Sequence, residues 1–161
     1  MASRAVDLLI AYRVLKMLVT PFNKQPAFKM GIIDDKGKVL KKFRTLTTTG
    51  EKQSYTMLHR FVFNLKRILA KAGIRGALGS FAVAAALLLR ENKKYVQHKE
   101  VIEATVITYL KENNLYEEIL NESREIPEVY TDDKLFCTCF GVDVFERDGE
   151  LRSEFDYAET L

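Results

Sequence analysis

Apolar residues recur at helical spacing along most of the first two thirds of this chain. Between Ser3 and Thr20 they lie three and four positions apart, which predicts a helix with one buried stripe, formed by Val6, Leu9, Ile10, Val14, Met17 and Leu18. The stretch from Gly50 to Ala72 predicts a longer amphipathic helix, whose core side is formed by Leu58, Phe61, Val62, Leu65, Ile68 and Leu69. From Gly76 to Leu89 the chain is apolar on every side and shorter than the roughly 20 residues that span a bilayer, which predicts a central core helix.

The remaining apolar runs predict one more helical stretch and two β-hairpins. Residues 28–40 hold two short runs around an Asp- and Gly-containing turn, which predicts a small ribbon after the first helix. Residues 101–120 return to helical spacing, with a mainly acidic exposed side. Residues 134–140 and 142–145 are strand-forming and predict a C-terminal hairpin. A turn at residues 147–150 leads to a short final run, and we expect the acidic residues from Glu154 onward to hang free.

These elements predict a mainly α fold with a small β-hairpin after the first helix and a C-terminal β-hairpin, which is an α+β class. A length of 161 residues with a hydrophobic share of 47% is enough for one folded domain and excludes a disordered chain. We expect residues 1–125 to form a helical core domain with the ribbon. We expect residues 126–161 to form the acidic hairpin and tail, packed on the same domain.

Charge is divided unevenly along the chain. Residues 1–98 carry 19 basic and 5 acidic side chains, whereas residues 99–161 carry 6 basic and 17 acidic side chains. The net charges of the two parts are therefore near +14 and −11, which the overall charge of +3 conceals. Such asymmetry indicates a basic face that meets nucleic acid, a membrane surface or an acidic partner, and an acidic part that competes for that contact.

Ten cations on two neighbouring predicted elements form the candidate site for an anionic partner. They are Lys36, Lys38, Lys41, Lys42 and Arg44 beside the ribbon, then Arg60, Lys66, Arg67, Lys71 and Arg75 along and just after the second helix. A phosphate backbone would bind such a surface through largely sequence-independent electrostatics. An ordinary solvated surface that protects the ribbon edges explains the cluster equally well. A third occupant is the acidic part of another copy, which would give head-to-tail contacts.

Groups suited to catalysis or metal binding are sparse. The only histidines, His59 and His98, do not lie at any spacing typical of metal ligands. Asp34 and Asp35 lie beside Gly37 in a predicted turn, and no third carboxylate is near enough in sequence to complete an ion site. We therefore predict no enzyme activity, no catalytic residue, no metal and no cofactor. A small hydrolase or nuclease built on the two aspartates is a minority alternative.

The glycines and cysteines carry no recognised motif either. Three glycines precede the apolar helix, but the last of them, Gly79, is followed by Ser80 and Phe81 instead of the Lys and Ser or Thr of a phosphate-binding loop. Cys137 and Cys139 are one residue apart on a predicted strand; we expect them to point to opposite faces and to remain reduced thiols. The N-terminal apolar stretch is interrupted by charges, so no secretory signal is predicted and we expect an intracellular protein.

Several runs of the sequence resemble a known group of viral proteins. They are residues 11–22 (AYRVLKMLVTPF), residues 27–34 (AFKMGIID) and residues 37–40, with short matches at residues 51–52, 55–56 and 63–67. Over residues 8–92 the chain resembles small structural proteins of T-even-type tailed bacteriophages, and among them the minor prohead core proteins. The resemblance stops before the acidic part.

This resemblance implies an internal scaffold component of the immature capsid, without catalysis or cofactor. The implied partners are other phage capsid or core proteins, with self-association and DNA as further candidates and no membrane. The implied location is the prohead or virion, assembled in the host cytoplasm. The alternative function is a nonspecific nucleic-acid-binding accessory protein that uses the basic N-terminal part.

Overall fold

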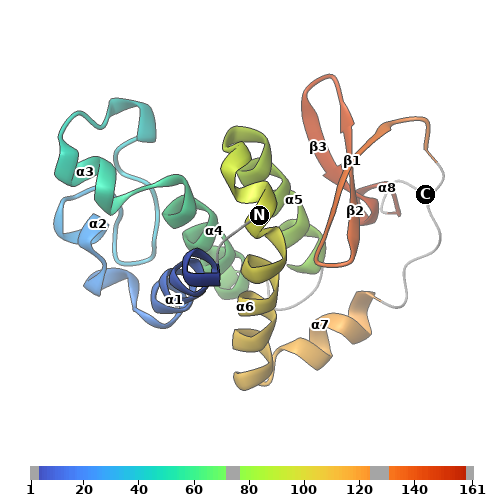
Figure 1. Ribbon diagram of the computed structural model, residues 1–161, viewed down its shortest axis with the longest axis horizontal. Coiled ribbons are helices and arrows are strands. Elements are labelled where there is room, and N and C mark those ends of the chain that lie inside the picture. The colour runs from blue at the N-terminus through green and yellow to red at the C-terminus, as the bar shows by residue number, and fades with distance from the viewer. Residues whose placement is uncertain (1–3, 72–76, 124–130, 159–161) are drawn as a thin grey trace.

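The computed structural model describes residues 4–71, 77–123 and 131–158, which are mostly helical with one small sheet (Figure 1). The α-helices are α1 (Arg4–Val19), α2 (Pro26–Lys29), α3 (Thr49–Ser54), α4 (Met57–Lys71), α5 (Ala77–Glu91), α6 (Lys99–Glu112), α7 (Tyr116–Ser123) and α8 (Glu154–Ala158). Three 3-10 helices connect them, namely η1 (Phe22–Lys24), η2 (Phe43–Thr45) and η3 (Lys93–His98). The strands are β1 (Lys134–Cys139), β2 (Val142–Arg147) and β3 (Glu150–Ser153).

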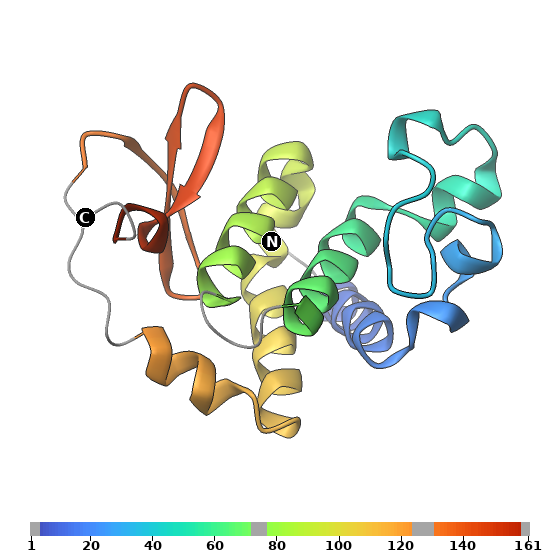
Figure 2. The same cartoon turned by 180° about the vertical axis from the view of Figure 1, so that it is seen from behind.

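Helix α5 is the centre of the molecule. It packs against α4 on one side and against all three strands on the other, so it separates the N-terminal helices from the sheet (Figures 1 and 2). Ten of its fifteen residues are buried, as expected for a helix that is apolar all round. The prediction of a central core helix is therefore confirmed.

A glycine allows the C-terminal layer to approach α5 closely. A Cβ atom at Gly79 would lie 2.6 Å from the ring of Phe155 and 2.8 Å from Oγ of Ser153. Phe155 belongs to α8, which begins where the C-terminal tail was expected to hang free. That expectation is wrong for residues 154–158, because Phe155 packs against the main core and Asp156 accepts a hydrogen bond from the backbone N–H of Ser153.

The sheet is antiparallel with strand order β1-β2-β3. The predicted C-terminal hairpin is formed by β1 and β2, and the short run after the turn at Asp148 and Gly149 adds a third strand. Cys139, Val142 and Val144 of the first two strands are buried in the main hydrophobic cluster together with residues of α1, α4, α5 and α6. The sheet and the helices thus share one core.

The ribbon predicted after the first helix is not formed. Pro26 opens a short helix there, and the only pairing around the turn in the described residues is an isolated bridge between Ile33 and Val39. Ile32 and Ile33 are both buried although they are consecutive, whereas Val39 and Leu40 are both exposed. Buried and exposed side chains therefore do not alternate along either run. A strand with one buried face would require such alternation.

Residues 22–55 form a lobe with a small core of its own. This second cluster is separate from the main one and consists of Ala27, Ile32, Ile33, Leu46, Tyr55 and Phe63, with Phe22, Phe28 and Phe43 packed against it. Phe63 is supplied by α4, whose Val62 and Leu65 belong to the main core. Helix α4 therefore joins the lobe to the remaining helices (Figure 1).

The helix predicted over residues 50–72 is divided into α3 and α4. Thr48 and Glu51 form a reciprocal capping box at the start of α3. Tyr55 leaves the helical conformation with φ −142° and ψ 65°, and its ring is buried in the lobe. Thr56 then caps α4 by accepting a hydrogen bond from the backbone N–H of His59. The N-termini of both helices are thus capped by side chains close in sequence.

Candidate interaction surface

The turn at residues 34–38 is built by an aspartate. Oδ1 of Asp34 accepts hydrogen bonds from the backbone N–H groups of Lys36, at 2.9 Å, and Lys38, at 2.8 Å. The bond from Lys38 is the main reason why the pKa of Asp34 is lowered. Gly37 completes the turn with φ +82°. Asp34 therefore has a structural role, and the turn holds Lys36 and Lys38 outward with exposed side chains.

Four of the ten predicted cations are exposed on this loop and its continuation. They are Lys36, Lys38, Lys42 and Arg44, and no ion pair within the described part of the chain involves any of them. Lys41 is also exposed, but its Nζ lies 3.6 Å from a carboxylate oxygen of Glu51. We name Lys36, Lys38, Lys42 and Arg44 the basic loop. Their charge is available to an anionic partner.

Lys66 does not lie on the predicted contact surface. Its Nζ donates to the backbone carbonyl of Met17, at 3.2 Å, and to that of Thr20, and it lies 4.4 Å from the centre of the Phe22 ring. Gln25, which is buried, donates its amide N–H groups to the same two carbonyls. Burial lowers the pKa of Lys66 to about 8. Lys66 thus closes the C-terminal end of α1, where a cation interacts favourably with the helix dipole.

The two arginines of α4 are also engaged within the molecule. Arg67 donates from Nη1 to the carbonyl of Gly37, at 2.5 Å, and so ties the turn to α4. Arg60 lies over the Phe43 ring at 4.9 Å and donates to Glu91 of α5 at 3.4 Å. Of the other predicted cations, Lys71 is the last residue of α4 and Arg75 lies outside the described residues. Of the eight predicted cations whose side chains the structure describes, the five on the loop are exposed, whereas the three on α4 are engaged within the molecule.

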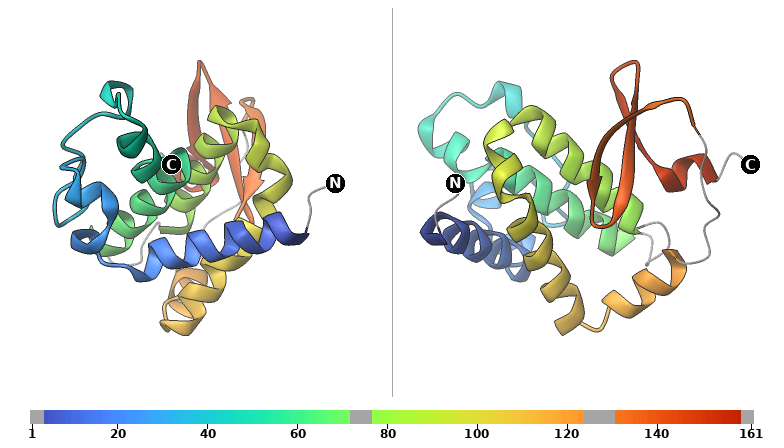
Figure 3. Two further views of the ribbon diagram at one scale, coloured as in Figure 1. Left: turned by 60° about the vertical axis from the view of Figure 1, so that its left-hand side comes forward. Right: turned by 45° about the vertical axis from the view of Figure 1, so that its right-hand side comes forward.

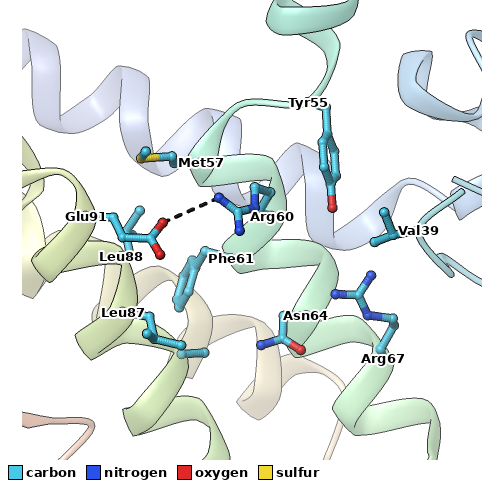
Figure 4. Close-up of a pocket in the computed structure, with 11 residues that line it drawn as sticks. Val39, Tyr55, Met57, Arg60, Phe61, Asn64, Arg67, Leu87, Leu88 and Glu91 are labelled. Carbon is cyan, nitrogen blue, oxygen red and sulfur yellow. Dashed lines mark hydrogen bonds and ion pairs between the residues drawn. The ribbon is translucent and has the colours of Figure 1, made fainter. Parts of the chain in front are cut away.

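A pocket of about 250 Å³ opens between α4 and α5 beside these arginines. Figure 4 shows Arg60 turned toward Glu91, with Arg67 near Val39 of the loop and Phe61 between the two helices. Of the three charged residues that line the pocket, Arg60 and Glu91 form an ion pair. Arg67 donates to the carbonyl of Gly37 and therefore keeps its net positive charge.

Within the described residues, neither histidine belongs to a cluster of side chains that could hold a metal ion. His98 is buried, and its Nδ1 lies 2.7 Å from Asp7, which connects η3 to α1. Nδ1 of His59 accepts the backbone N–H of Thr56 at 3.2 Å. Burial, assisted by the charge of Arg13, lowers the pKa of His59 to about 4. Across residues 4–71, 77–123 and 131–158, no group of three or more His, Cys, Asp or Glu side chains could hold a metal ion.

The two cysteines lie on the same side of β1, contrary to our expectation. Their sulfur atoms are 3.2 Å apart, and this contact lowers the pKa of Cys137 and raises that of Cys139. The expectation failed because residues two positions apart on a strand share a face; it is neighbouring residues that point to opposite faces. Cys139 is buried in the main core, while Cys137 is half-buried at its edge.

Among the described residues, exposed large apolar side chains are most numerous on α1, where no site was predicted from the sequence. Among the described residues, six of the eleven exposed large hydrophobic side chains belong to this helix. Two of them, Val6 and Leu9, were assigned to the buried stripe but are 43% and 48% exposed. The other four are Leu8, Tyr12, Leu15 and Val19. The spacing of these four residues already indicated a second apolar line along the helix, because they follow each other at steps of four, three and four residues.

No family model, curated protein or solved structure matches this chain. None of the helices in the described ranges is both long enough and apolar enough to cross a membrane.

Proposed function

We propose that this protein is a non-enzymatic bacteriophage structural protein, a component of the prohead core, that acts by associating with other capsid or core subunits. The observation that carries the proposal is the apolar outer face of α1. An apolar patch that a monomer leaves in water is typical of a protein–protein contact. The resemblance of residues 8–92 to prohead core proteins supports this kind of assembly, which would form in the host cytoplasm.

Charge supplies a second contact in this proposal. The basic loop would lie against the acidic part of a neighbouring subunit, since residues 99–161 carry 17 acidic side chains. Salt weakens such a contact, whereas contact through the apolar face of α1 persists in salt. The two contacts can therefore be separated by varying the ionic strength.

The alternative function, nonspecific binding of nucleic acid, is favoured by the same basic loop. Lys36, Lys38, Lys42 and Arg44 are exposed side chains of one sign on a single segment, and a phosphate backbone would accept them without regard to sequence. This function would not need the apolar face of α1.

Light scattering of the purified protein over a salt series, with and without a short DNA duplex, tests the proposal. We expect the mass to grow with protein concentration in the absence of DNA, and to grow further at low salt. Replacing all four basic-loop residues by Gln should remove only the salt-dependent part. A protein that stays monomeric alone and gains mass only with the duplex would refute the proposal and establish the alternative.

A further inference from the structure

The cysteine pair of β1 lies at the wall of a cavity on the far side of the molecule from the basic loop. A pocket of about 520 Å³ is lined by residues of β1, the end of α5, η3 and the start of α6, and Cys137 is one of them. In the right view of Figure 3 the sheet stands beside α5, against which β1 packs. A pocket of this volume is in the range that takes a small-molecule ligand. Half-buried Cys137 therefore borders a space large enough for a reagent.

A β-bulge lies in β1 beside this pocket. Leu135 pairs with Phe145 of β2. Cys137 is two residues further along β1 but pairs with Val144, only one residue back along β2, so β1 has one extra residue here. Successive residues of a regular strand point to opposite faces, yet Phe136 and Cys137 both line the pocket. The bulge allows this arrangement, because bulges redirect the side chains beside them and are frequent next to functional sites.

The two thiols differ in access and in acidity. Cys139 is fully buried and Cys137 is half-buried, and their sulfur atoms are 3.2 Å apart. The hydrogen bond between them is the main reason why the pKa of Cys137 is lowered, and the charge of Lys99 lowers it further. The same hydrogen bond, together with burial, raises the pKa of Cys139. Because the thiolate is the nucleophilic form, Cys137 is the better attacking group of the two.

The charged residues that line this pocket are all basic. They are Arg90, Lys93 and Lys99, and none of the described residues of the lining is acidic. Lys93 is exposed and forms no ion pair within the described residues, while Arg90 donates to the carbonyl of Gly149 and keeps its charge. Only Lys99 has a carboxylate partner among the described residues, Glu103 at 3.5 Å. A cleft lined by charge of one sign concentrates ligands of the other sign, so the pocket favours a ligand with carboxylate groups.

We propose that Cys137 and Cys139 form a thiol–disulfide exchange site for a small disulfide that carries carboxylates, of the glutathione type. The Cys137 thiolate attacks one sulfur of the bound disulfide; the disulfide bond of the ligand breaks as the bond to Cys137 forms, and one small thiol leaves. Cys139 then gives up its proton and attacks the sulfur of Cys137, which releases the second small thiol. The two cysteines lose two electrons and two protons, and the ligand gains both as two thiols. The modification is stoichiometric and independent of the association proposed above.

The arrangement of the two sulfur atoms suits the second step. They are 3.2 Å apart and need to approach to about 2.05 Å to form the bond between Cys137 and Cys139. Cys139 belongs to the main hydrophobic cluster and has no exposed surface, so a reagent in the pocket reaches Cys137 first. A mixed disulfide on Cys137 would therefore be formed in contact with the one thiol that can displace it.

The charge on the pocket is tested with two disulfides. Lys93→Gln with Lys99→Gln removes two cations from the pocket, and Lys36→Gln with Lys38→Gln makes the same change of charge on the basic loop. For each protein we compare the rate with glutathione disulfide, which is anionic, to the rate with hydroxyethyl disulfide, which is uncharged. The ratio of the two rates cancels the effect of Lys99 on the Cys137 thiolate. It should fall about threefold or more in the pocket variant only; equal ratios in the two variants would overturn the acidic ligand.

Intact-mass spectrometry of the full chain after reaction with glutathione disulfide tests the roles of the thiols, since the chain has only these two cysteines. The unmodified protein should lose the mass of two hydrogen atoms and both titratable thiols. Cys139→Ala should stop with one glutathione bound at Cys137, and Cys137→Ala should react at least about tenfold more slowly, because its remaining thiol is buried. Circular dichroism confirms that the variants are folded. Two glutathiones on the unmodified protein, no reaction at all, or equal rates of the two variants would each overturn the proposal.

Discussion

The end of α1 is closed by Lys66, and replacing this residue by methionine tests whether the ammonium group stabilises the fold. Lys66→Met keeps a side chain of similar length but removes the donors to the carbonyls of Met17 and Thr20 and the cation over the Phe22 ring. Gln25 still donates to both carbonyls in the variant. The substitution therefore removes one of the two side-chain donors from each carbonyl, and each carbonyl keeps its hydrogen bond from Gln25.

The expected magnitude follows from two opposing effects. A hydrogen bond from a charged donor contributes about 1.5–3 kcal/mol, and a cation at a helix C-terminus contributes about 0.3–1 kcal/mol. Burial of the ammonium group offsets both contributions, because it removes part of the hydration of the charge and so lowers the pKa of Lys66. Solvent around this half-buried side chain reduces the cost of burial to about half. We expect Lys66→Met to lower the free energy of unfolding by about 1–2 kcal/mol at pH 7, equivalent to about 2–8 °C in Tm.

Urea unfolding followed by far-ultraviolet circular dichroism measures this difference. Lys42→Met is the matched control, because Lys42 is an exposed lysine of the same lobe outside any ion pair in the described residues. The control should change the free energy of unfolding by less than about 0.5 kcal/mol. Equal stability of the two variants, or a more stable Lys66→Met, would refute the stabilising role of Lys66.

The pH dependence gives an independent check on the same residue. The folded protein releases the Lys66 proton near pH 8, whereas the unfolded chain keeps it to about pH 10.5. Between these values the unfolded chain binds more protons, so the stability of the unmodified protein should rise with pH. Lys66→Met should lack this rise, and the difference between the two proteins should widen between pH 8 and 10. A constant difference would show that burial of the charge costs nothing.

Two further experiments test features of the lobe and of α4. His59→Gln should keep the cap with Thr56, because glutamine serves at this position of a capping box, and should flatten the loss of stability between pH 6.5 and 4 by about 1–2 kcal/mol. The loss of stability arises because the histidine takes up a proton in the unfolded chain, whereas buried His59 stays neutral in the folded protein. Urea midpoints at pH 7 and 4.5 measure this loss. An equally steep loss in the variant would exclude His59 as its source. Both Gly31 and Gly37 have positive φ, so Gly31→Ala should lower the free energy of unfolding by about 1 kcal/mol. Gly37→Ala should lower it further, because a Cβ at Gly37 would also lie 2.4 Å from the Phe22 ring. Thermal unfolding of the two variants side by side decides this, and equal losses would mean that the ring moves aside at no cost.

Helix periodicity predicted most of the fold, because it depends on neighbours along the chain. The bounds of α1 and the burial of α5 agree with the apolar pattern, and so do the paired strands β1 and β2. The ribbon failed where local signals conflicted. Pro26 favours a helical start, and the consecutive burial of Ile32 and Ile33 is determined by the lobe core, which involves residues as distant as Phe63.

The candidate site was harder to predict, since the partners of its cations are backbone atoms far away in sequence. Lys66 contacts carbonyls 46 and 49 residues earlier, and Arg67 contacts one 30 residues earlier. A carbonyl group is present in every residue, so no pattern of side chains marks these positions as acceptors. The exposed apolar line Leu8, Tyr12, Leu15 and Val19 of α1 could have been predicted from its spacing, but assigning a single apolar stripe to the helix concealed this second one.

The buried hydrophobic side chains form two separate clusters, and we expect the parts of the protein that they hold together to unfold at different free energies. The lobe has a small hydrophobic cluster, and it is joined to α4 by Phe63, by Lys66 over the Phe22 ring and by the bond from Arg67 to the carbonyl of Gly37. Its release would leave the larger cluster, and with it both sides of α5, in place. Segments with few buried contacts open at lower free energy than the whole domain. We therefore expect the lobe, and the basic loop with it, to open at lower free energy than the helices and the sheet.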